Sequence, residues 1–80
     1  MMADFKTILS DMVKPIVVYP DDVVITEEAK GDTVTLTLNV NPSDMGKVIG
    51  KHGKIARSLR LIMKAAATQS GKKVNVEIRE

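Results

Sequence analysis

Cysteine is absent from the 80 residues of this sequence, which excludes disulfides, thiolate metal sites and thiol nucleophiles. The single histidine, His52, cannot form a cluster of metal ligands, so neither a metal nor a cofactor is expected. Only Phe5 and Tyr19 are aromatic, too few to build a sheet surface on which bases stack. These absences disfavour metalloproteins and the RRM and OB-fold classes of nucleic-acid-binding domain.

Long apolar runs are also missing. No segment approaches the roughly 20 apolar residues that span a bilayer. Residues 1–6 lack the apolar stretch that is typical of a secretion signal. We therefore expect a cytoplasmic protein.

Catalytic arrangements are missing as well. The sequence offers no nucleophile paired with a base and no cluster of carboxylates, so an enzyme is not expected. Residues 46–51 superficially resemble a phosphate-binding P-loop, but three residues rather than four separate the glycines, and His52 replaces Ser or Thr. ATP binding is therefore rejected.

The length of the chain allows one hydrophobic core, so residues 1–80 are expected to form a single domain. A domain of this size buries only about 60–65% of its unfolded surface. Association with a partner subunit is plausible, because an interface would cover part of the rest.

Charge is distributed unevenly along the chain, although the net charge is only +2. Residues 1–45 carry three lysines against eight acids, a net charge of −5. Residues 46–80 carry nine lysines or arginines against two acids, a net charge of +7, and residues 46–73 contain no acid. An anionic ligand is therefore expected to bind the second half of the chain.

The first segment predicts an amphipathic helix. Apolar residues follow one helical stripe from Phe5 to Ile16. Pro15 disfavours helical geometry at the residue before it, so the helix is expected to end near Lys14. Residues 1–20 would then form an N-terminal helix and an apolar connector packed on the rest of the domain.

Three segments have the β-branched or alternating pattern of strands: residues 23–26, 33–40 and 74–79. A turn at Gly31 joins the first two, which are expected to pair antiparallel. Asn41 caps a short helix after the second strand, with Asp44 in its first turn.

A longer helix is expected from about Lys54 to Gln69, with Gly71 as its C-cap. Its predicted apolar stripe consists of Ile55, Leu59, Ile62, Met63 and Ala66. Two helices between strands form a right-handed crossover, which makes the second and third strands parallel. The expected fold is α+β, a two-layer sandwich of three helices on a mixed three-stranded sheet, in the order α-β-β-α-α-β.

Two glycines bracket two polar residues at the junction of the two later helices, in residues 50–53 of sequence GKHG. Glycine lets the backbone bend sharply and approach a ligand closely, while N–H groups at the start of the next helix face outward. The helix dipole adds about half a positive charge there, and Lys47, Lys51 and Lys54 add full charges. The junction therefore favours a phosphate group.

Residues 48–55, of sequence VIGKHGKI, resemble the KH-domain signature, in which an apolar pair precedes GxxG and an apolar residue follows it. The order of the predicted elements resembles a type II KH domain. Almost the whole chain is similar to the KhpA family of small bacterial single-KH proteins, including residues 13–15, 22–23 and 45–50.

The resemblance implies a groove for about four nucleotides of single-stranded RNA, between the GxxG loop and the sheet edge. The loop would contact phosphates, the apolar residues would lie beneath the bases, and Lys54 and Arg57 would hold the RNA backbone. The candidate RNA-binding residues are Lys47, Val48, Ile49, Gly50, Lys51, His52, Gly53, Lys54, Ile55 and Arg57. The resemblance also implies an RNA chaperone or post-transcriptional regulator linked to cell shape, and a KhpB-type partner.

Other interpretations stay open. The GKHG segment can be a tight helix connection that needs glycine only for its turn. Val48, Ile49 and Ile55 favour the core over the groove, because a small domain needs its apolar residues inside. Four basic residues can merely solvate the exposed side of the long helix: Lys54, Arg57, Arg60 and Lys64.

Leu61 lies on the stripe of the long helix opposite the predicted core, and Ala65 is small enough to let a second helix approach. We therefore predict a homodimer through Leu61, Lys64 and Ala65. This interface raises an alternative function. The chain would be a dimerising interaction subunit, whose partner in a heterodimer supplies most of the RNA binding.

Overall fold

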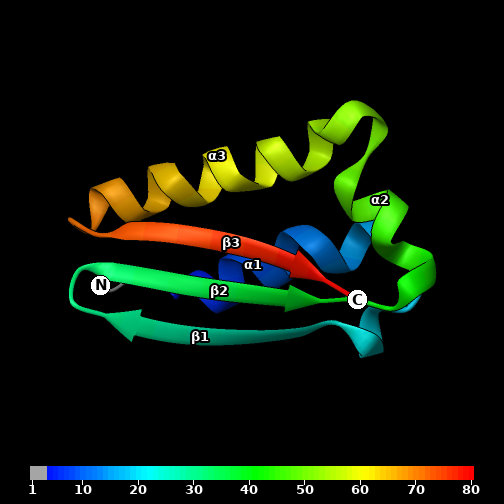
Figure 1. Cartoon of the computed structure of the whole chain (residues 1–80), viewed down its shortest axis with the longest axis horizontal. Coiled ribbons are helices and arrows are strands. Elements are labelled where there is room, and N and C mark those ends of the chain that lie inside the picture. Colours follow the sequence, from blue (N-terminus) through cyan, green and yellow to red (C-terminus); the bar gives the residue numbers. More distant parts are fainter. Residues whose placement is uncertain (1–3) are drawn as a thin grey trace.

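The computed structural model describes residues 4–80. The expectation that residues 1–6 are no secretion signal therefore falls partly outside the described residues. The order α-β-β-α-α-β and the α+β fold class are confirmed (Figure 1). The helices and strands are α1 (Phe5–Val13), β1 (Val24–Lys30), β2 (Thr33–Asn39), α2 (Met45–Ile49), α3 (Lys54–Gln69) and β3 (Lys73–Arg79). Short 3-10 turns lie between them, at Lys14–Ile16, Pro20–Asp22, Pro42–Asp44 and Lys51–Gly53.

The strands form one sheet in the order β1-β2-β3. As predicted, β1 pairs antiparallel with β2, and β2 pairs parallel with β3. The parallel pairing is possible because α2 and α3 carry the chain back to the end of the sheet at which β2 began. β1 and β3 are therefore the two edges of the sheet.

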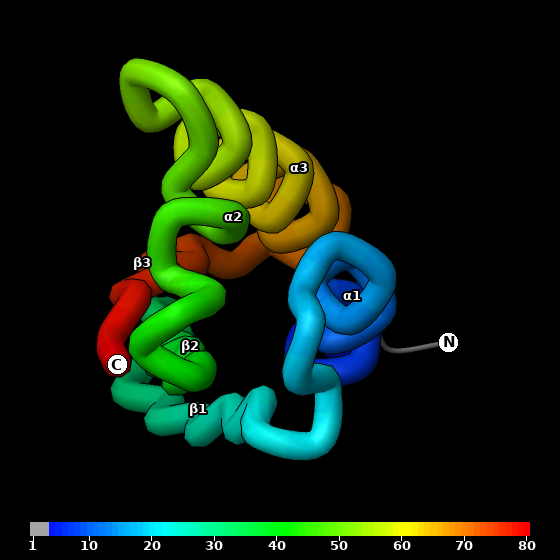
Figure 2. Tube along the Cα trace, turned by 90° about the vertical axis from the view of Figure 1, so that its right-hand side faces the viewer, coloured from blue at the N-terminus to red at the C-terminus, as the bar shows by residue number. Residues whose placement is uncertain are grey.

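The helices cover one face of the sheet, and the core lies between the two layers (Figure 2). β2 supplies the middle of this core through alternate residues, while its threonines point to the other face. The buried apolar side chains that cluster there are Phe5, Leu9, Val13, Val34, Leu36, Leu38, Val40, Val48, Leu59, Met63, Ala67 and Val76. They come from all three helices, from β2 and β3, and, in the case of Val40, from the residue after β2, so the N-terminal helix shares the core of the domain.

α3 has the predicted boundaries, but its buried stripe is rotated from the prediction. Leu59 and Met63 are buried as expected, whereas Ile62 is 48% exposed and Ile55 also lies at the surface. Ala56 and Ala67 are buried in their place. Alanine lets α3 pack closely against its neighbours, and a periodic pattern does not separate an apolar residue on the flank of a helix from one in the core.

The predicted first strand was too short. Its β-branched residues end at Thr26, but β1 continues to Lys30 because every residue from Val24 onward pairs with β2. Pairing with a neighbouring strand overrides the low strand propensity of Glu, Ala and Lys. α1 ends at Val13, one residue before the predicted end near Lys14, and the chain then forms a 3-10 turn from Lys14 to Ile16.

Asp44 fastens the connector to the domain, a role that the sequence analysis did not identify. Its carboxylate is 1% exposed and accepts hydrogen bonds from the backbone N–H groups of Val18, at 2.9 Å, and Tyr19, at 3.0 Å. Asn41, expected to cap the short helix, instead caps the 3-10 turn Pro42–Asp44 by accepting a hydrogen bond from the Ser43 N–H, and Asp44 is the N-cap residue of α2. Asp44 therefore joins the start of α2 to a segment 25 residues away in sequence.

Replacing Asp44 by alanine is expected to lower the free energy of unfolding by about 2–4 kcal/mol, because two N–H groups lose their partner. Urea denaturation would measure this loss. Asp21→Ala is the matched control, since Asp21 is an exposed acid in the next turn and its removal should change stability by less than about 0.5 kcal/mol. Equal effects of the two substitutions would contradict an anchoring role for Asp44.

Candidate nucleic-acid interface

The GKHG loop between α2 and α3 bends through three left-handed backbone conformations. Gly50 has φ +76°, Gly53 has φ +74°, and His52 has φ +58°. The Gly53 N–H donates to the Gly50 carbonyl oxygen at 3.1 Å, which closes the loop on itself. The side chains of Lys51 and His52 are exposed between the two glycines. The loop therefore projects one cation and one imidazole into solvent on a tightly folded backbone.

Gly50 is required for a second reason besides its φ. A β-carbon at this position would lie 2.6 Å from Cγ1 of Ile55 and 2.8 Å from its Cβ, well inside contact distance. At Gly53 and Gly46 a β-carbon would meet no atom within 4 Å. The first turn of α3 thus packs directly against the loop, and only glycine allows that approach.

We expect Gly50→Ala to lower the free energy of unfolding by at least about 2 kcal/mol, from the positive φ and the collision with Ile55. Gly46→Ala adds the same methyl group inside α2, where it should raise stability by about 0.5–1 kcal/mol. Chemical denaturation of both variants would measure these changes. A Gly50→Ala protein as stable as wild type would contradict the close packing.

Arg57 holds the loop from within α3. Its Nη2 donates to the His52 carbonyl oxygen at 2.6 Å, and its Nε makes a longer contact with the Gly53 carbonyl oxygen at 3.5 Å. A guanidinium carries five N–H donors, so these bonds leave further donors for a ligand. Arg57 therefore fixes the backbone of the loop and keeps a positive charge beside it.

The start of α3 is electropositive. No side chain caps this helix and no acid lies in its first turn, so its free N–H groups and its dipole are not neutralised locally. Lys54 is its first residue, Lys51 lies in the loop before it and Lys47 in α2, and all three lysines are exposed. Within residues 4–80 the one ion pair joins Arg79 to Glu77, so none of these lysines is engaged by a carboxylate.

The three candidate apolar residues differ in their surroundings. Val48 is 0% exposed and belongs to the core, which confirms the core interpretation for this residue. For the other two that interpretation is wrong, because Ile49 is 39% and Ile55 is 37% exposed. Ile49 and Ile55 thus present apolar surface on either side of the GKHG loop.

β3 offers a free edge beside α3. The Lys73 N–H donates to the Asp32 carbonyl oxygen at 2.8 Å, on the side of β2. In a parallel strand the backbone groups of alternate residues point to opposite sides, so those of Val76 point to the free edge. Nε of Arg60, on α3, donates to the Val76 carbonyl oxygen at 3.2 Å.

That contact gives Arg60 a role beyond solvating α3, which sequence reasoning did not find. The bond is partly buried and joins residues 16 positions apart, so no local pattern indicates it. It links the middle of α3 to the sheet. The GKHG loop, α3 and the edge of β3 therefore border one electropositive region.

The residues predicted to form a dimer lie on the outer side of α3. Leu61, Lys64 and Ala65 are all exposed. Leu61 is 68% exposed, the largest fraction among the large apolar side chains of residues 4–80. The dimer stays a prediction.

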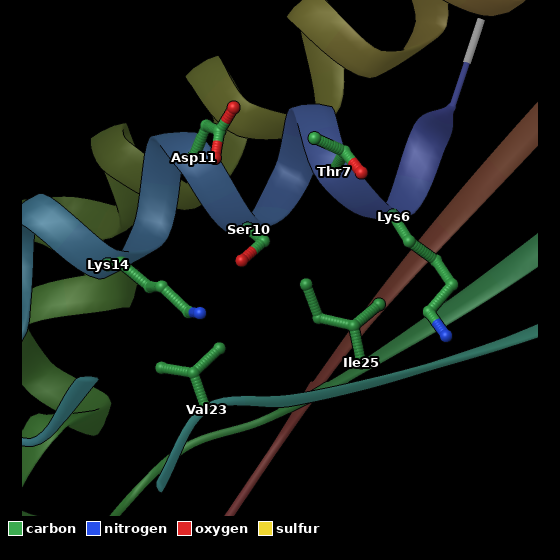
Figure 3. Close-up of a pocket in the computed structure, with 7 residues that line it drawn as sticks. All are labelled: Lys6, Thr7, Ser10, Asp11, Lys14, Val23 and Ile25. Carbon is green, nitrogen blue, oxygen red and sulfur yellow. The ribbon is translucent and has the colours of Figure 1, made fainter. Parts of the chain in front are cut away.

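A separate hollow of about 250 Å³ lies between α1 and β1 (Figure 3). Val23 and Ile25 form its floor, and Lys6 of α1 and Lys14 of the 3-10 turn after it flank the hollow. Because β1 and β3 are opposite edges of the sheet, this hollow lies at the other edge from the GKHG region.

None of the helices in residues 4–80 combines the length and apolarity needed to cross a bilayer. No group of three histidine, aspartate or glutamate side chains in the same part of the chain is placed to hold a metal ion.

Comparison with known proteins identifies the family. Residues 6–78 match the family model described as "KhpA/KhpB, KH domain". The "RNA-binding protein KhpA" of Listeria monocytogenes is 42% identical over 75 residues, which cover 94% of this chain and 99% of the relative. The proteins of that name from Clostridium acetobutylicum and Bacillus subtilis are 45% and 42% identical over 73 residues, 91% of this chain and 97% and 90% of theirs. No solved structure gives a significant match. The chain therefore belongs to the KhpA/KhpB family of KH-domain proteins.

Proposed function

We propose that this protein binds single-stranded RNA, with about four nucleotides in the groove between the GKHG loop and the free edge of β3. The observation that carries the proposal is the loop itself, a tightly bent backbone at an uncapped helix start, surrounded by lysines without carboxylate partners. The names of the relatives, which describe RNA-binding proteins, support the same ligand.

In this groove the RNA backbone would lie against residues 50–53. The absence of side chains at Gly50 and Gly53 lets phosphates approach the peptide groups, and the dipole of α3 attracts them. Lys47, Lys51 and Lys54 would neutralise phosphate charge, and the imidazole of His52 would donate a hydrogen bond to a phosphate oxygen.

The bases would lie on the other side of the groove. Exposed parts of Ile49 and Ile55 would contact their apolar faces, while Val48 supports this surface from the core. Backbone groups at the free edge of β3 would bond base edges. Arg57 would hold the RNA backbone with the donors that the loop carbonyls leave free.

The wider role that we propose is that of an RNA chaperone or post-transcriptional regulator in the cytoplasm, with an influence on cell shape. A second candidate is a dimerising interaction subunit, in a homodimer or with a KhpB-type partner that supplies most of the RNA binding. The exposure of Leu61 beside the small Ala65 favours this candidate. RNA titrations of the protein alone, and then with such a partner, would separate the two candidates.

Binding is expected to be salt-sensitive and to favour single strands. Contact with about three phosphates predicts a log-log salt slope of about −2, since each phosphate of a single strand contributes about −0.7. Fluorescence anisotropy with a short RNA at several ionic strengths measures the slope. The control is the same RNA annealed to its complement. Equal affinity for the duplex would contradict a KH groove.

A further inference from the structure

A second basic hollow lies at the far end of α3, where the chain turns into β3. Its volume is about 650 Å³. Its polar lining comes from Asp32, Lys64, Thr68, Lys72, Lys73 and Asn75. Three lysines thus face one aspartate, and none of these lysines forms an ion pair among residues 4–80. The hollow has the charge of an anion site.

The backbone around the hollow is fixed by hydrogen bonds. The Lys72 N–H donates to the Ala67 carbonyl oxygen at 2.9 Å, and the Gly71 N–H donates to the Thr68 carbonyl oxygen at 3.1 Å. The Lys73 N–H is held by the Asp32 carbonyl oxygen of the hairpin turn. These bonds fix the backbone of Lys72 and Lys73, and so the directions in which their side chains leave it, before any ligand binds.

The turn between α3 and β3 lies at the opposite end of α3 from the GKHG loop (Figure 1), and Gly71 and Lys72 of this turn line the hollow. Arg57, Arg60 and Lys64 follow one another at intervals of three and four residues, which places them along one side of α3. Arg57 bonds the loop, Arg60 bonds the edge of β3, and Lys64 lines the hollow. α3 contains no acid. A positive path therefore runs from the loop to the hollow.

The length of this path exceeds four stacked nucleotides. A helix of 16 residues is about 24 Å long, from a rise of about 1.5 Å per residue. At the phosphate spacing of about 3.4 Å in a stacked strand, about seven phosphates fit along it. A strand held at the loop would therefore reach the lysines at the other end.

We propose that the hollow of Lys64, Lys72 and Lys73 is a second RNA subsite, which holds about three nucleotides beyond those in the GKHG groove. The inference rests on the proposed function and extends it, because it sets the length of RNA that the domain binds. The ligand is a continuous strand, since the same side of α3 joins both ends of the path.

The test compares mixed-sequence RNAs of about four and about eight nucleotides by the slope of log affinity against log salt concentration. A longer RNA can bind in several positions, which raises its affinity but does not change this slope. The wild type should give a slope of about −2 on the short RNA and about −4 on the long one. Lys72→Glu with Lys73→Glu should bring the slope on the long RNA back to about −2 and leave short-RNA affinity within about twofold. Lys72→Gln with Lys73→Gln should give an intermediate slope, in a variant that perturbs folding less.

The matched control is Lys6→Glu with Lys14→Glu, which makes the same change of charge at the opposite edge of the sheet (Figure 3). It should keep the slope of about −4 on the long RNA. Equal wild-type slopes on both RNAs, or a steep slope retained by the Lys72 and Lys73 variants, would overturn the subsite and leave the proposed function standing. If the wild type binds neither RNA, the proposed function fails and the subsite with it.

Discussion

Replacement of both Lys51 and His52 by aspartate is expected to weaken RNA binding at least about 100-fold. A phosphate near the loop now meets a lysine and the positive end of α3, and in the variant it would meet two carboxylates. Near a protein surface, a pair of charges about 4 Å apart interacts with about 1–4 kcal/mol. Replacing the lysine by aspartate therefore costs the lost attraction and adds a repulsion of similar size. The variant should show no measurable affinity at physiological salt.

The same substitutions are expected to leave the fold intact. Both side chains are exposed, and the bonds that shape the loop use backbone carbonyls at Gly50, His52 and Gly53, which aspartate does not remove. Aspartate tolerates the left-handed conformation of His52, and its charge suits the start of α3. Stability should therefore change by less than about 0.5 kcal/mol.

Circular dichroism melts beside RNA titrations would test this prediction, because they separate lost binding from unfolding. Lys6→Asp with Lys14→Asp reverses two charges elsewhere and should keep most of the affinity. If the doubly substituted loop melts normally and binds RNA within about threefold of wild type, the GKHG loop is not the phosphate site.

A second large effect is expected at Leu61. If two copies pair through the outer side of α3, a twofold axis brings Leu61 close to its own copy. Leu61→Glu would place two carboxylates in that contact, and burying them costs several kcal/mol, which weakens the dimer at least about 100-fold. Sedimentation at tens of micromolar should change from dimer to monomer.

Ile62→Glu is the matched control for this change. Like Leu61, Ile62 is an exposed apolar side chain of α3 and has the same number of carbon atoms, but it lies on the flank of the helix rather than opposite the core. This variant should sediment as the wild type does. Monomeric behaviour of the wild type itself would show that the outer side of α3 is no interface.

The elements with strong local signals could be predicted from the sequence. α3 begins after a glycine-bounded loop and has the predicted boundaries, although its C-cap is Ser70 and the predicted cap, Gly71, is the next residue, with a φ of +70°. The alternation in β2 predicted which side of that strand is buried in the core and which is only half-buried. In both cases the information lies within a few neighbouring residues.

Features made by distant residues could not be predicted. Asp44 has the position of a helix-start acid, and nothing nearby indicates that it bonds Val18 and Tyr19. The second half of β1 has a sequence that avoids strands, and pairing with β2 holds it extended. From the sequence, Arg60 is only a charged residue on the exposed side of α3; its bond to β3 depends on the position of that strand in the fold.

The candidate site was predictable in part for the same reason. The two glycines and Lys51 of the GKHG loop are adjacent in the sequence, and Lys47 and Lys54 lie within three residues of the loop, so the sequence alone placed them together. The burial of Val48 and the exposure of Ile49 depend on how α2 lies against the sheet, which the sequence pattern does not specify. The hollow at the far end of α3 joins residues of α3, of β3 and of the turns before β2 and β3, and no sequence motif marks it.

The two sheet edges described above also differ in their resistance to aggregation. An open edge strand is a template for adding strands from other molecules. On β1, antiparallel pairing of two copies centred on Glu27 would set like charges against each other, with Glu28 one position away. On β3, Arg60 occupies the Val76 carbonyl. A continuous intermolecular sheet would need both edges of every molecule to pair, and each edge carries a feature that opposes pairing. The edge of β3 can therefore stay open for a ligand at high protein concentration.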